Sequence, residues 1–278
     1  MKTVFVIQHP DLAHLPLPQT ARHFRLPESI SGSSLRLAVA ADAAIPAEVA
    51  AELDAAGAEY ALLADTAFAD LGLIVSDMDS TLITIECIDE IAAAAGLKEQ
   101  VAAVTERAMR GEMDFETSLR ERVALLAGLP ESVLDDVYAH ALRLSPGAEY
   151  LLAECKKHQV KFLLVSGGFT FFTERLKERL GLDWAYANTL ETAGGKLTGR
   201  VVGPVIDAQA KARLLEEHRL ALGLERHQVA AVGDGANDIP MLQAAGFGIA
   251  YHAKPKTRAQ AALNIRHMGL EALRGWFA

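Results

Sequence analysis

The residues best suited to chemistry lie in the stretch Leu71–Ile83, where an apolar run ends on Asp77 and Asp79 and then on the hydroxyls of Ser80 and Thr81. A run of about five to seven apolar residues closed by polar ones is typical of a buried parallel strand. In open α/β sheets, ligands bind just beyond the carboxyl ends of such strands. The Asp-x-Asp pair therefore lies where chemistry is expected, although a simple strand-terminal turn explains the pair when it is taken alone.

A second strand-like segment, residues 160–168, ends on Ser166, Gly167 and Gly168. Glycines let backbone N–H groups approach an oxyanion, and the start of the following helix adds partial positive charge. The three residues together predict an anion-binding turn, while a flexible turn without a ligand would have the same composition.

A third segment, residues 229–240, is more specific because its apolar strand again ends in carboxylates. Asp234 lies between two glycines and has no evident structural duty. Asn237 and Asp238 follow it, and Asp238 could equally be the N-cap of a helix with Pro240 near its first turn.

Lys211 lies one turn into a helix predicted to begin near Asp207, so its ammonium could reach an anion at the carboxyl edge of the sheet. The alternative is an i,i+4 ion pair with Asp207 or simple solvation. Taken together, these segments bring carboxylates, a hydroxyl, glycines and a lysine to one edge. Hard oxygen ligands without His or Cys suit Mg²⁺, which also binds substrate phosphate. The set predicts a phosphoryl-transfer site.

The elements that must position these residues alternate between helix and strand from residue 148 onward. Such alternation implies a parallel sheet covered on both faces. The predicted elements are helices at 148–158, 171–180, 207–222 and 238–245, strands at 160–166, 229–233, 247–251 and 263–267, and a hairpin-like excursion at 190–202.

Two further segments flank this pattern. Residues 87–145 contain no strand signal and read as consecutive helices, near 98–110, 114–127 and 131–142, which suits a lid inserted into the core. Residues 1–70 read as a small separate unit with strands at 2–8 and 35–40, a loop-like segment between them and a helix at 46–58. This unit carries no cluster of catalytic residue types, so a structural or dimerising role and a regulatory role both stay open.

Composition limits the classes of function. The chain has 278 residues, 51% hydrophobic and 23% charged, which indicates a soluble globular protein of more than one domain. Its net charge of −9 and the lack of a dense Lys/Arg run argue against nucleic acid as a partner. Two cysteines and nine histidines show no zinc-ligand spacing. Without a signal peptide or a membrane span, the expected location is the cytoplasm.

Four ordered motifs resemble the haloacid dehalogenase superfamily of aspartate-based phosphatases. They are Asp77–Thr81, Ser166–Gly168, Lys211 and Gly233–Asp238, and the likeness covers about residues 71–278. It implies a Rossmann-like α/β fold with a parallel-sheet core formed by residues 71–86 and 146–278. A helical cap would occupy residues 87–145, and a small α+β domain would occupy residues 1–70, which resemble the family only loosely.

The resemblance also implies roles for the core residues. Asp77 would be the nucleophile that forms an aspartyl-phosphate, and Asp79 would protonate the leaving oxygen and then activate water. Mg²⁺ would be held by Asp77, the backbone carbonyl of Asp79 and Asp234, with Asp238 supporting it. The transferring oxygens would be bound by Ser166, Gly167, Gly168 and Lys211, with Asn237 orienting this set.

Within the superfamily, the segments 86–90, 106–115 and 118–122 are similar to the substrate-reading cap of the phosphoserine phosphatase family. Arg122 can also be interpreted without that likeness, because Phe115, Leu119 and Leu126 fall within roughly 60° of it on a helix. A guanidinium in an apolar stripe either extends past its neighbours to water or holds a substrate carboxylate bidentately.

Glu86 is likewise surrounded by apolar neighbours in the sequence, and the resemblance implies that it pairs with a substrate ammonium. Met109 and Phe115 would be walls of the cap that exclude water. Cys87 and Cys155 are interpreted as buried thiols rather than catalytic ones.

These observations predict a Mg²⁺-dependent hydrolase that converts O-phospho-L-serine to serine and phosphate, the last step of serine biosynthesis. One alternative is the same chemistry on another small phosphate or with transfer to another acceptor. A second alternative is an amino-acid-sensing module in which residues 1–68 bind serine. The sequence leaves open whether the chain forms a homodimer.

Overall fold

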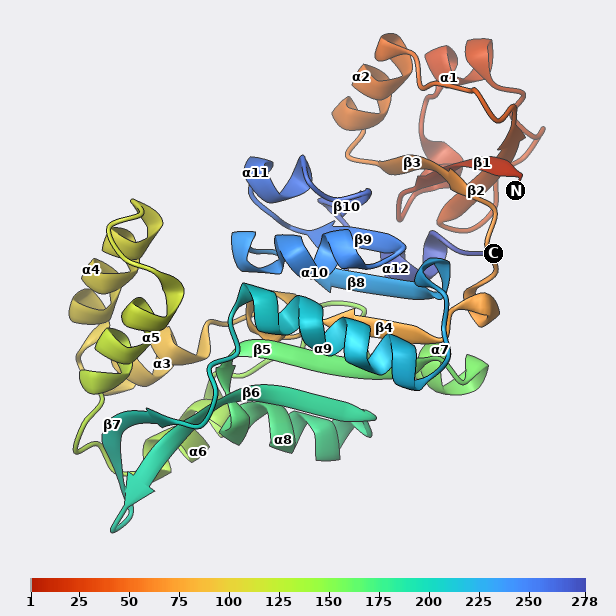
Figure 1. The fold of residues 1–278 in the computed structure, drawn as a ribbon. Helices are drawn as coiled ribbons and strands as arrows, with labels where there is room; N and C mark the ends of the chain where they lie inside the picture. The colour runs from red at the N-terminus through yellow and green to blue at the C-terminus, as the bar shows by residue number, and fades with distance from the viewer. Residues whose placement is uncertain (1) are drawn as a thin grey trace.

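The computed structural model describes residues 2–278, which form a small three-stranded unit, a seven-stranded α/β core and a helical insertion (Figure 1). Over these residues, no helix combines the length and the apolar character needed to cross a membrane.

The seven-stranded sheet confirms the predicted fold class. Its strands follow the order β10-β9-β8-β4-β5-β6-β7, and all neighbours are parallel except β6 and β7. Strand β4, which carries the Asp-x-Asp pair at its end, lies in the middle of the sheet. The strands are β4 (Leu73–Ser76), β5 (Lys161–Phe169), β6 (Trp184–Ala193), β7 (Lys196–Val202), β8 (Val229–Gly233), β9 (Phe247–Tyr251) and β10 (Leu263–Ile265).

Helices cover both faces of this sheet. Helices α9 (Ala208–Ala221) and α10 (Ile239–Ala244) pack together on one face, and Leu73 and Val75 of β4 point into that layer. Ile74 points into the opposite layer. That layer holds α7 (Ala148–His158), α8 (Thr170–Leu180) and α12 (Glu271–Gly275), while the short α11 (Pro255–Arg258) lies between β9 and β10 in the chain. Burial on both faces explains why β4 and β8 are continuous apolar runs.

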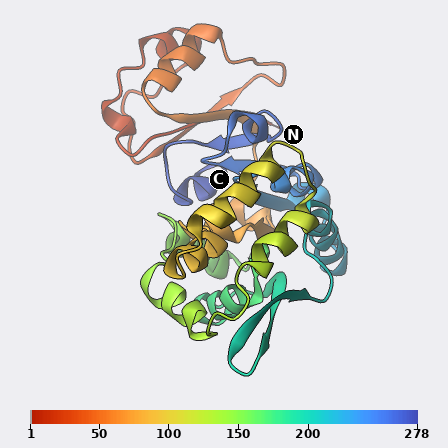
Figure 2. The same cartoon turned by 90° about the vertical axis from the view of Figure 1, so that its left-hand side faces the viewer.

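The segment between β4 and α7 is helical, as predicted. It contains α3 (Cys87–Ala94), α4 (Lys98–Met109), α5 (Phe115–Ala124) and α6 (Ser132–His140), and Figure 2 shows α3, α4 and α5 in front of the carboxyl edge of the sheet. The chain leaves and re-enters the core at a bridge between Ile83 and Leu144. Asp114 caps α5 as expected, because its carboxylate accepts a 2.8 Å hydrogen bond from the Thr117 amide.

The N-terminal unit is more regular than its sequence suggested. Strands β1 (Thr3–Gln8), β2 (Ser34–Val39) and β3 (Glu59–Ala64) form an antiparallel sheet in the order β2-β1-β3. Helices α1 (Pro18–His23) and α2 (Ala47–Ala55) complete the unit. The prediction missed β3 and treated the segment containing α1 as loop. Helix α1 is too short to show a helical period, and the alanines of β3 are weak strand formers.

The predicted hairpin at 190–202 is part of a longer feature. Strand β6 begins at Trp184 and pairs in parallel with β5 before it turns back as β7. Most of β6 is only half-buried, so it lacks the apolar run that revealed the central strands. The far part of this hairpin reaches the insertion, where Arg120 of α5 donates to the Val201 carbonyl at 3.3 Å.

Candidate active site

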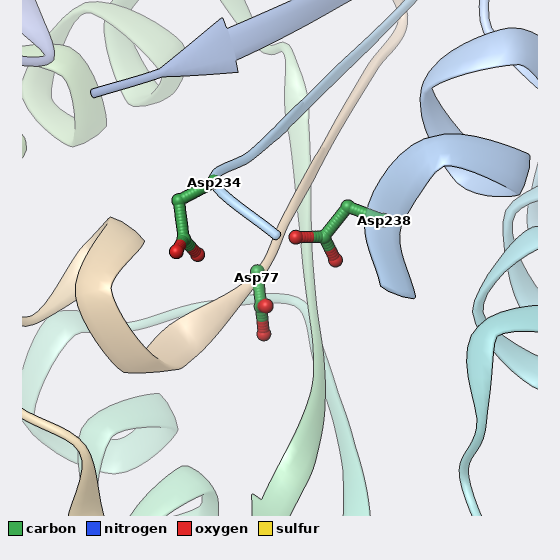
Figure 3. Close-up of side chains that lie close together, drawn as sticks. All are labelled: Asp77, Asp234 and Asp238. Carbon is green, nitrogen blue, oxygen red and sulfur yellow. The ribbon is translucent and has the colours of Figure 1, made fainter. Parts of the chain in front are cut away.

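The ends of β4 and β8 bring three carboxylates together. Asp77 follows β4 directly, Asp234 follows β8, and Asp238 lies in the short helical turn Ala236–Asp238 that precedes α10. One oxygen from each carboxylate lies within 4.8 Å of the others, and Figure 3 shows the three side chains converging. The convergence arises because β4 and β8 are adjacent parallel strands whose carboxyl ends share one edge.

Lys211 is buried between two of these carboxylates. Its Nζ lies 2.7 Å from an oxygen of Asp77 and 2.7 Å from an oxygen of Asp238. Burial alone would lower the pKa of Lys211, but the charges of Asp238 and Asp77 outweigh it and raise that pKa above its usual value. The alternative pairing with Asp207 is wrong, since Asp207 instead caps α9 by accepting from the Ala210 amide at 2.8 Å.

Asp238 does not cap α10 with its side chain. Besides Lys211, its carboxylate accepts a 3.0 Å hydrogen bond from the Gly235 amide. It therefore fixes both the lysine and the glycine turn that carries Asp234. Asp234 itself accepts from the Thr81 hydroxyl at 3.2 Å, which ties this turn to the loop after β4.

The carboxylate cluster carries more negative charge than its lysine can balance. Burial, followed by the charge of Asp238, raises the pKa of Asp77 well above its usual range and that of Asp234 to about 6. Three oxygen ligands with no sulfur or imidazole form the donor set that Mg²⁺ favours. The excess charge and the donor chemistry therefore both fit a hard divalent cation, which the carboxylates of Asp77, Asp234 and Asp238 could hold.

Asp79 lies in a different environment from Asp77. One of its oxygens accepts from the Cys87 amide at 3.3 Å, and the other is buried without a hydrogen-bond partner. Burial, followed by the negative charge of Glu86, raises the pKa of Asp79 to about 7. A carboxyl group with this pKa can both donate and accept a proton near neutral pH.

The end of β5 supplies the predicted hydroxyl and glycines. Ser166 is buried, and its Oγ accepts a 2.8 Å hydrogen bond from the Gly168 amide. A Cβ at Gly168 would lie 3.1 Å from a carboxylate oxygen of Asp79, and one at Gly167 would lie 3.1 Å from the Phe115 ring. The lack of side chains here therefore lets β5, the Asp-x-Asp loop and α5 approach one another closely.

Asn188 is a supporting residue that the sequence did not reveal. It is fully buried on β6, where its amide nitrogen donates to the Gly167 carbonyl at 2.9 Å. Its amide oxygen accepts from the Ile206 amide at 2.8 Å, just before α9. Asn188 thus fixes the glycine turn relative to the helix that carries Lys211. A lone asparagine in a half-buried strand gives no distinguishing signal.

A cavity of about 380 Å³ joins the carboxyl edge of the sheet to the helical insertion. Most of the predicted site residues line it. On the core side these are Asp77, Asp79, Ser166, Gly167, Gly168, Asp234 and Asn237, and on the insertion side they are Glu86, Met109, Phe115 and Arg122. Lys211, predicted to bind the transferring oxygens, does not line the cavity and instead contacts Asp77 and Asp238. Thr105, Met113 and Ser118 line it as well and were not predicted.

Two opposite charges face this cavity. Glu86 accepts a hydrogen bond from the Ser80 hydroxyl at 2.7 Å, and burial raises its pKa. Arg122 donates from Nε to the Ser118 carbonyl at 3.3 Å, and among residues 2–278 no carboxylate lies within ion-pair distance of it. Burial lowers the pKa of Arg122, although the charges of Asp89 and Glu86 act in the opposite direction. The guanidinium is therefore half-buried without an anion.

Comparison with known proteins agrees with this geometry. The model of the haloacid dehalogenase-like hydrolase family matches residues 74–243. A phosphoserine phosphatase of Polaromonas sp. is 52% identical over 75% of this chain and 91% of its own length. The unliganded crystal structure of a probable phosphoserine phosphatase from Vibrio cholerae is 43% identical, with a TM-score of 0.82 over 98% of this chain and 85% of that one.

The chain is also similar to a solved structure that represents a reaction intermediate. The structure of a phospho-aspartyl intermediate analogue of a phosphoserine phosphatase is 41% identical, with a TM-score of 0.70 over 75% of this chain and 99% of that one. The chain belongs to the haloacid dehalogenase-like hydrolases and, among them, to the phosphoserine phosphatase family.

Proposed function

We propose that this chain hydrolyses O-phospho-L-serine to serine and inorganic phosphate with Mg²⁺, as the final step of serine biosynthesis. The observation that carries the proposal is that one cavity is lined by Asp77 and Asp79 on the core side and by Glu86 and Arg122, which has no ion-pair partner among residues 2–278, on the insertion side. Such a cavity offers a cation for the carboxylate, an anion for the ammonium and a phosphoryl-transfer edge for the phosphate of one amino acid ester.

The first half-reaction uses the two aspartates together. A carboxylate oxygen of Asp77 attacks phosphorus while the bond from phosphorus to the seryl oxygen breaks. Asp79 in its protonated form donates its proton to that oxygen, so serine leaves as a neutral alcohol. The pKa of Asp79, about 7, leaves a large protonated fraction at neutral pH.

The second half-reaction reverses the role of Asp79. Its carboxylate takes a proton from water as the water oxygen attacks phosphorus of the aspartyl-phosphate. The bond from phosphorus to the Asp77 oxygen breaks, which releases phosphate and restores the carboxylate. Mg²⁺ at the carboxylate cluster would neutralise the repulsion between the phosphate and the aspartates.

The other residues position and enclose the substrate in this scheme. Lys211 fixes Asp77 through the 2.7 Å contact, and Ser166 with the amide of Gly167 would bind the phosphoryl oxygens. We further propose that residues 87–145 act as a cap whose walls include Phe115 and Met109. Met109 is 67% exposed although it lines the cavity, which suits a wall that moves when substrate binds.

The test is the release of phosphate from O-phospho-L-serine and from a panel of small phosphate esters, with Mg²⁺ and after chelation. We expect a strong preference for phosphoserine that depends on Mg²⁺. Equal rates on esters without an amino acid group would contradict the proposal that phosphoserine is the substrate. They would still be consistent with the aspartate-based mechanism. Release that occurs only with an added alcohol acceptor would indicate a phosphotransferase.

A further inference from the structure

Ser80 directly follows the proposed acid Asp79, and its backbone conformation is unusual. Its φ is +54°, in the left-handed region that costs free energy for a residue with a Cβ. Glycine would adopt the same turn without that cost. A side chain at such a position indicates that the side chain itself has a role.

The Ser80 side chain forms a hydrogen bond with Glu86. Its hydroxyl donates to Oε1 of Glu86 at 2.7 Å, and the Ser80 amide donates to the Ile85 carbonyl at 3.2 Å. The Cys87 amide in turn donates to a carboxylate oxygen of Asp79 at 3.3 Å. These three bonds hold the turn after Asp79 against the residues that open α3. The Glu86 carboxylate is therefore fixed next to the proposed acid.

The catalytic cavity is lined by Glu86 but not by Ser80. The Glu86 side chain is accessible from the cavity, whereas Ser80 is half-buried outside the cavity lining. Among residues 2–278, the Glu86 carboxylate has no ion pair and accepts no hydrogen bond besides the one from Ser80. Its second oxygen is thus available to a ligand. Ser80 can influence that ligand only through the position of Glu86.

We propose that Ser80 is a positioning residue for amino-acid specificity, whose hydroxyl holds the Glu86 carboxylate where the substrate ammonium binds. The inference rests on the proposed function, because it concerns the ammonium of phosphoserine. Without this bond the glutamate would sample several rotamers, and the cost of ordering it would reduce the affinity gained from the ammonium. Loss of the hydroxyl should therefore weaken recognition of the ammonium and leave recognition of the phosphate unchanged.

The first test measures KM of Ser80→Ala and Ser80→Gly for phosphoserine and for its deamino analogue, which lacks only the ammonium. Both substitutions remove the hydroxyl, and the glycine variant also removes the cost of the left-handed turn. We expect KM for phosphoserine to rise about tenfold in both variants, while KM for the deamino analogue changes less than about twofold.

Thr84→Ala is the matched control for these variants. The Thr84 hydroxyl lies in the same segment between β4 and α3, but it donates to the Arg143 carbonyl at 3.5 Å. Its removal should leave both KM values unchanged. If Ser80→Ala and Ser80→Gly raised KM equally for both substrates, the turn would have a general structural role and the proposal would be overturned.

A double-mutant cycle tests whether Ser80 acts through Glu86. In a Glu86→Ala background, Ser80→Ala should raise KM for phosphoserine by less than about twofold, because the group that it positions is absent. The same rise in both backgrounds would mean that the two residues act independently, and the proposal would be wrong.

The unmodified chain and Glu86→Ala separate this inference from the proposed function. The unmodified chain should prefer phosphoserine to the deamino analogue, and Glu86→Ala should lose that preference. If the unmodified chain had no such preference, the proposed substrate and the role of Ser80 would both be wrong. If Glu86→Ala lost the preference while Ser80→Ala and Ser80→Gly kept it, only the role of Ser80 would be wrong.

Discussion

At the scale of single residues, Asp79 is distinguished from Asp77 by its surroundings. Its protonated form is the proposed acid, so kcat/KM should fall as the pH rises through its pKa, which burial and Glu86 raise to about 7. Glu86→Gln removes the neighbouring negative charge and should therefore lower the pKa of Asp79. The fall in kcat/KM at alkaline pH should then begin at a lower pH. The measurement is a pH profile on the deamino analogue of phosphoserine, which has no ammonium for Glu86 to bind. If the fall in kcat/KM occurred at the same pH in both proteins, Glu86 would not influence the pKa of Asp79.

Asp77→Asn should remove the nucleophile while preserving the fold. The amide oxygen can still accept from the Met78 amide, which donates to Asp77 at 2.6 Å, and one negative charge leaves the crowded cluster. We expect turnover to fall by at least about a hundredfold, with a melting temperature close to that of the unmodified chain. Stopped phosphate-release assays and circular dichroism provide the two readings. Residual activity above about 1% in a folded variant would contradict the role of Asp77.

Arg122→Ala should impair recognition of the substrate carboxylate. KM for phosphoserine should rise about tenfold or more, while KM for an aryl phosphate without a carboxylate should change little. Arg110→Ala is the matched control, because Arg110 is an exposed arginine of the same insertion that pairs with Glu112 outside the cavity. If both substrates were affected equally, Arg122 would have a structural role instead.

At the scale of elements, the hairpin of β6 and β7 supports the helix that carries Arg122. Gly199 of β7 adopts a φ of +80°, and a Cβ there would lie 2.8 Å from the Ala127 Cβ, just after α5. Gly199→Ala should therefore displace α5, lower stability by about 1–3 kcal/mol and raise KM for phosphoserine. Gly194→Ala, at a φ of +59° with nothing within 4 Å, isolates the backbone strain alone. Equal effects of both substitutions on KM would exclude the contact with α5.

The elements that the sequence predicted are those with strong local signals. Strands β4 and β8 are buried on both faces and therefore appear in the sequence as short apolar runs. Asp114 caps α5 and therefore marks the start of that helix. Strand β6 lies near the edge of the sheet and is mostly half-buried, so no apolar run in the sequence reveals its first half.

The site was predictable to the extent that its residues cluster in motifs at strand ends. The pairing of Lys211 with Asp77 and Asp238 and the support from Asn188 depend on how distant strands pack, and no local pattern encodes them.

At the scale of the whole molecule, the N-terminal unit and the core share one apolar layer. Val6 and Leu63 of the unit belong to the same buried cluster as Phe68 and Trp276. Arg36 also donates to the Trp276 carbonyl at 2.8 Å. The chain should therefore unfold in urea in a single transition seen alike by tryptophan fluorescence and circular dichroism.

Val6→Ala should lower the free energy of unfolding of the entire molecule by about 1–3 kcal/mol without splitting that transition. Two separated transitions, with Val6→Ala moving only one of them, would show that the N-terminal unit unfolds on its own.

The contact between the hairpin and α5 also bears on how such enzymes diversify. Because the Gly128 amide donates to the Leu197 carbonyl at 2.8 Å and Arg120 donates to Val201, the insertion is fastened to the core at a place far from its two chain connections. If a foreign insertion replaced the residues between 86 and 146, it would lie beside the same carboxyl edge of the sheet. It would lack this second attachment to the hairpin. A foreign insertion would therefore need a matching hairpin to be attached to the core at both places.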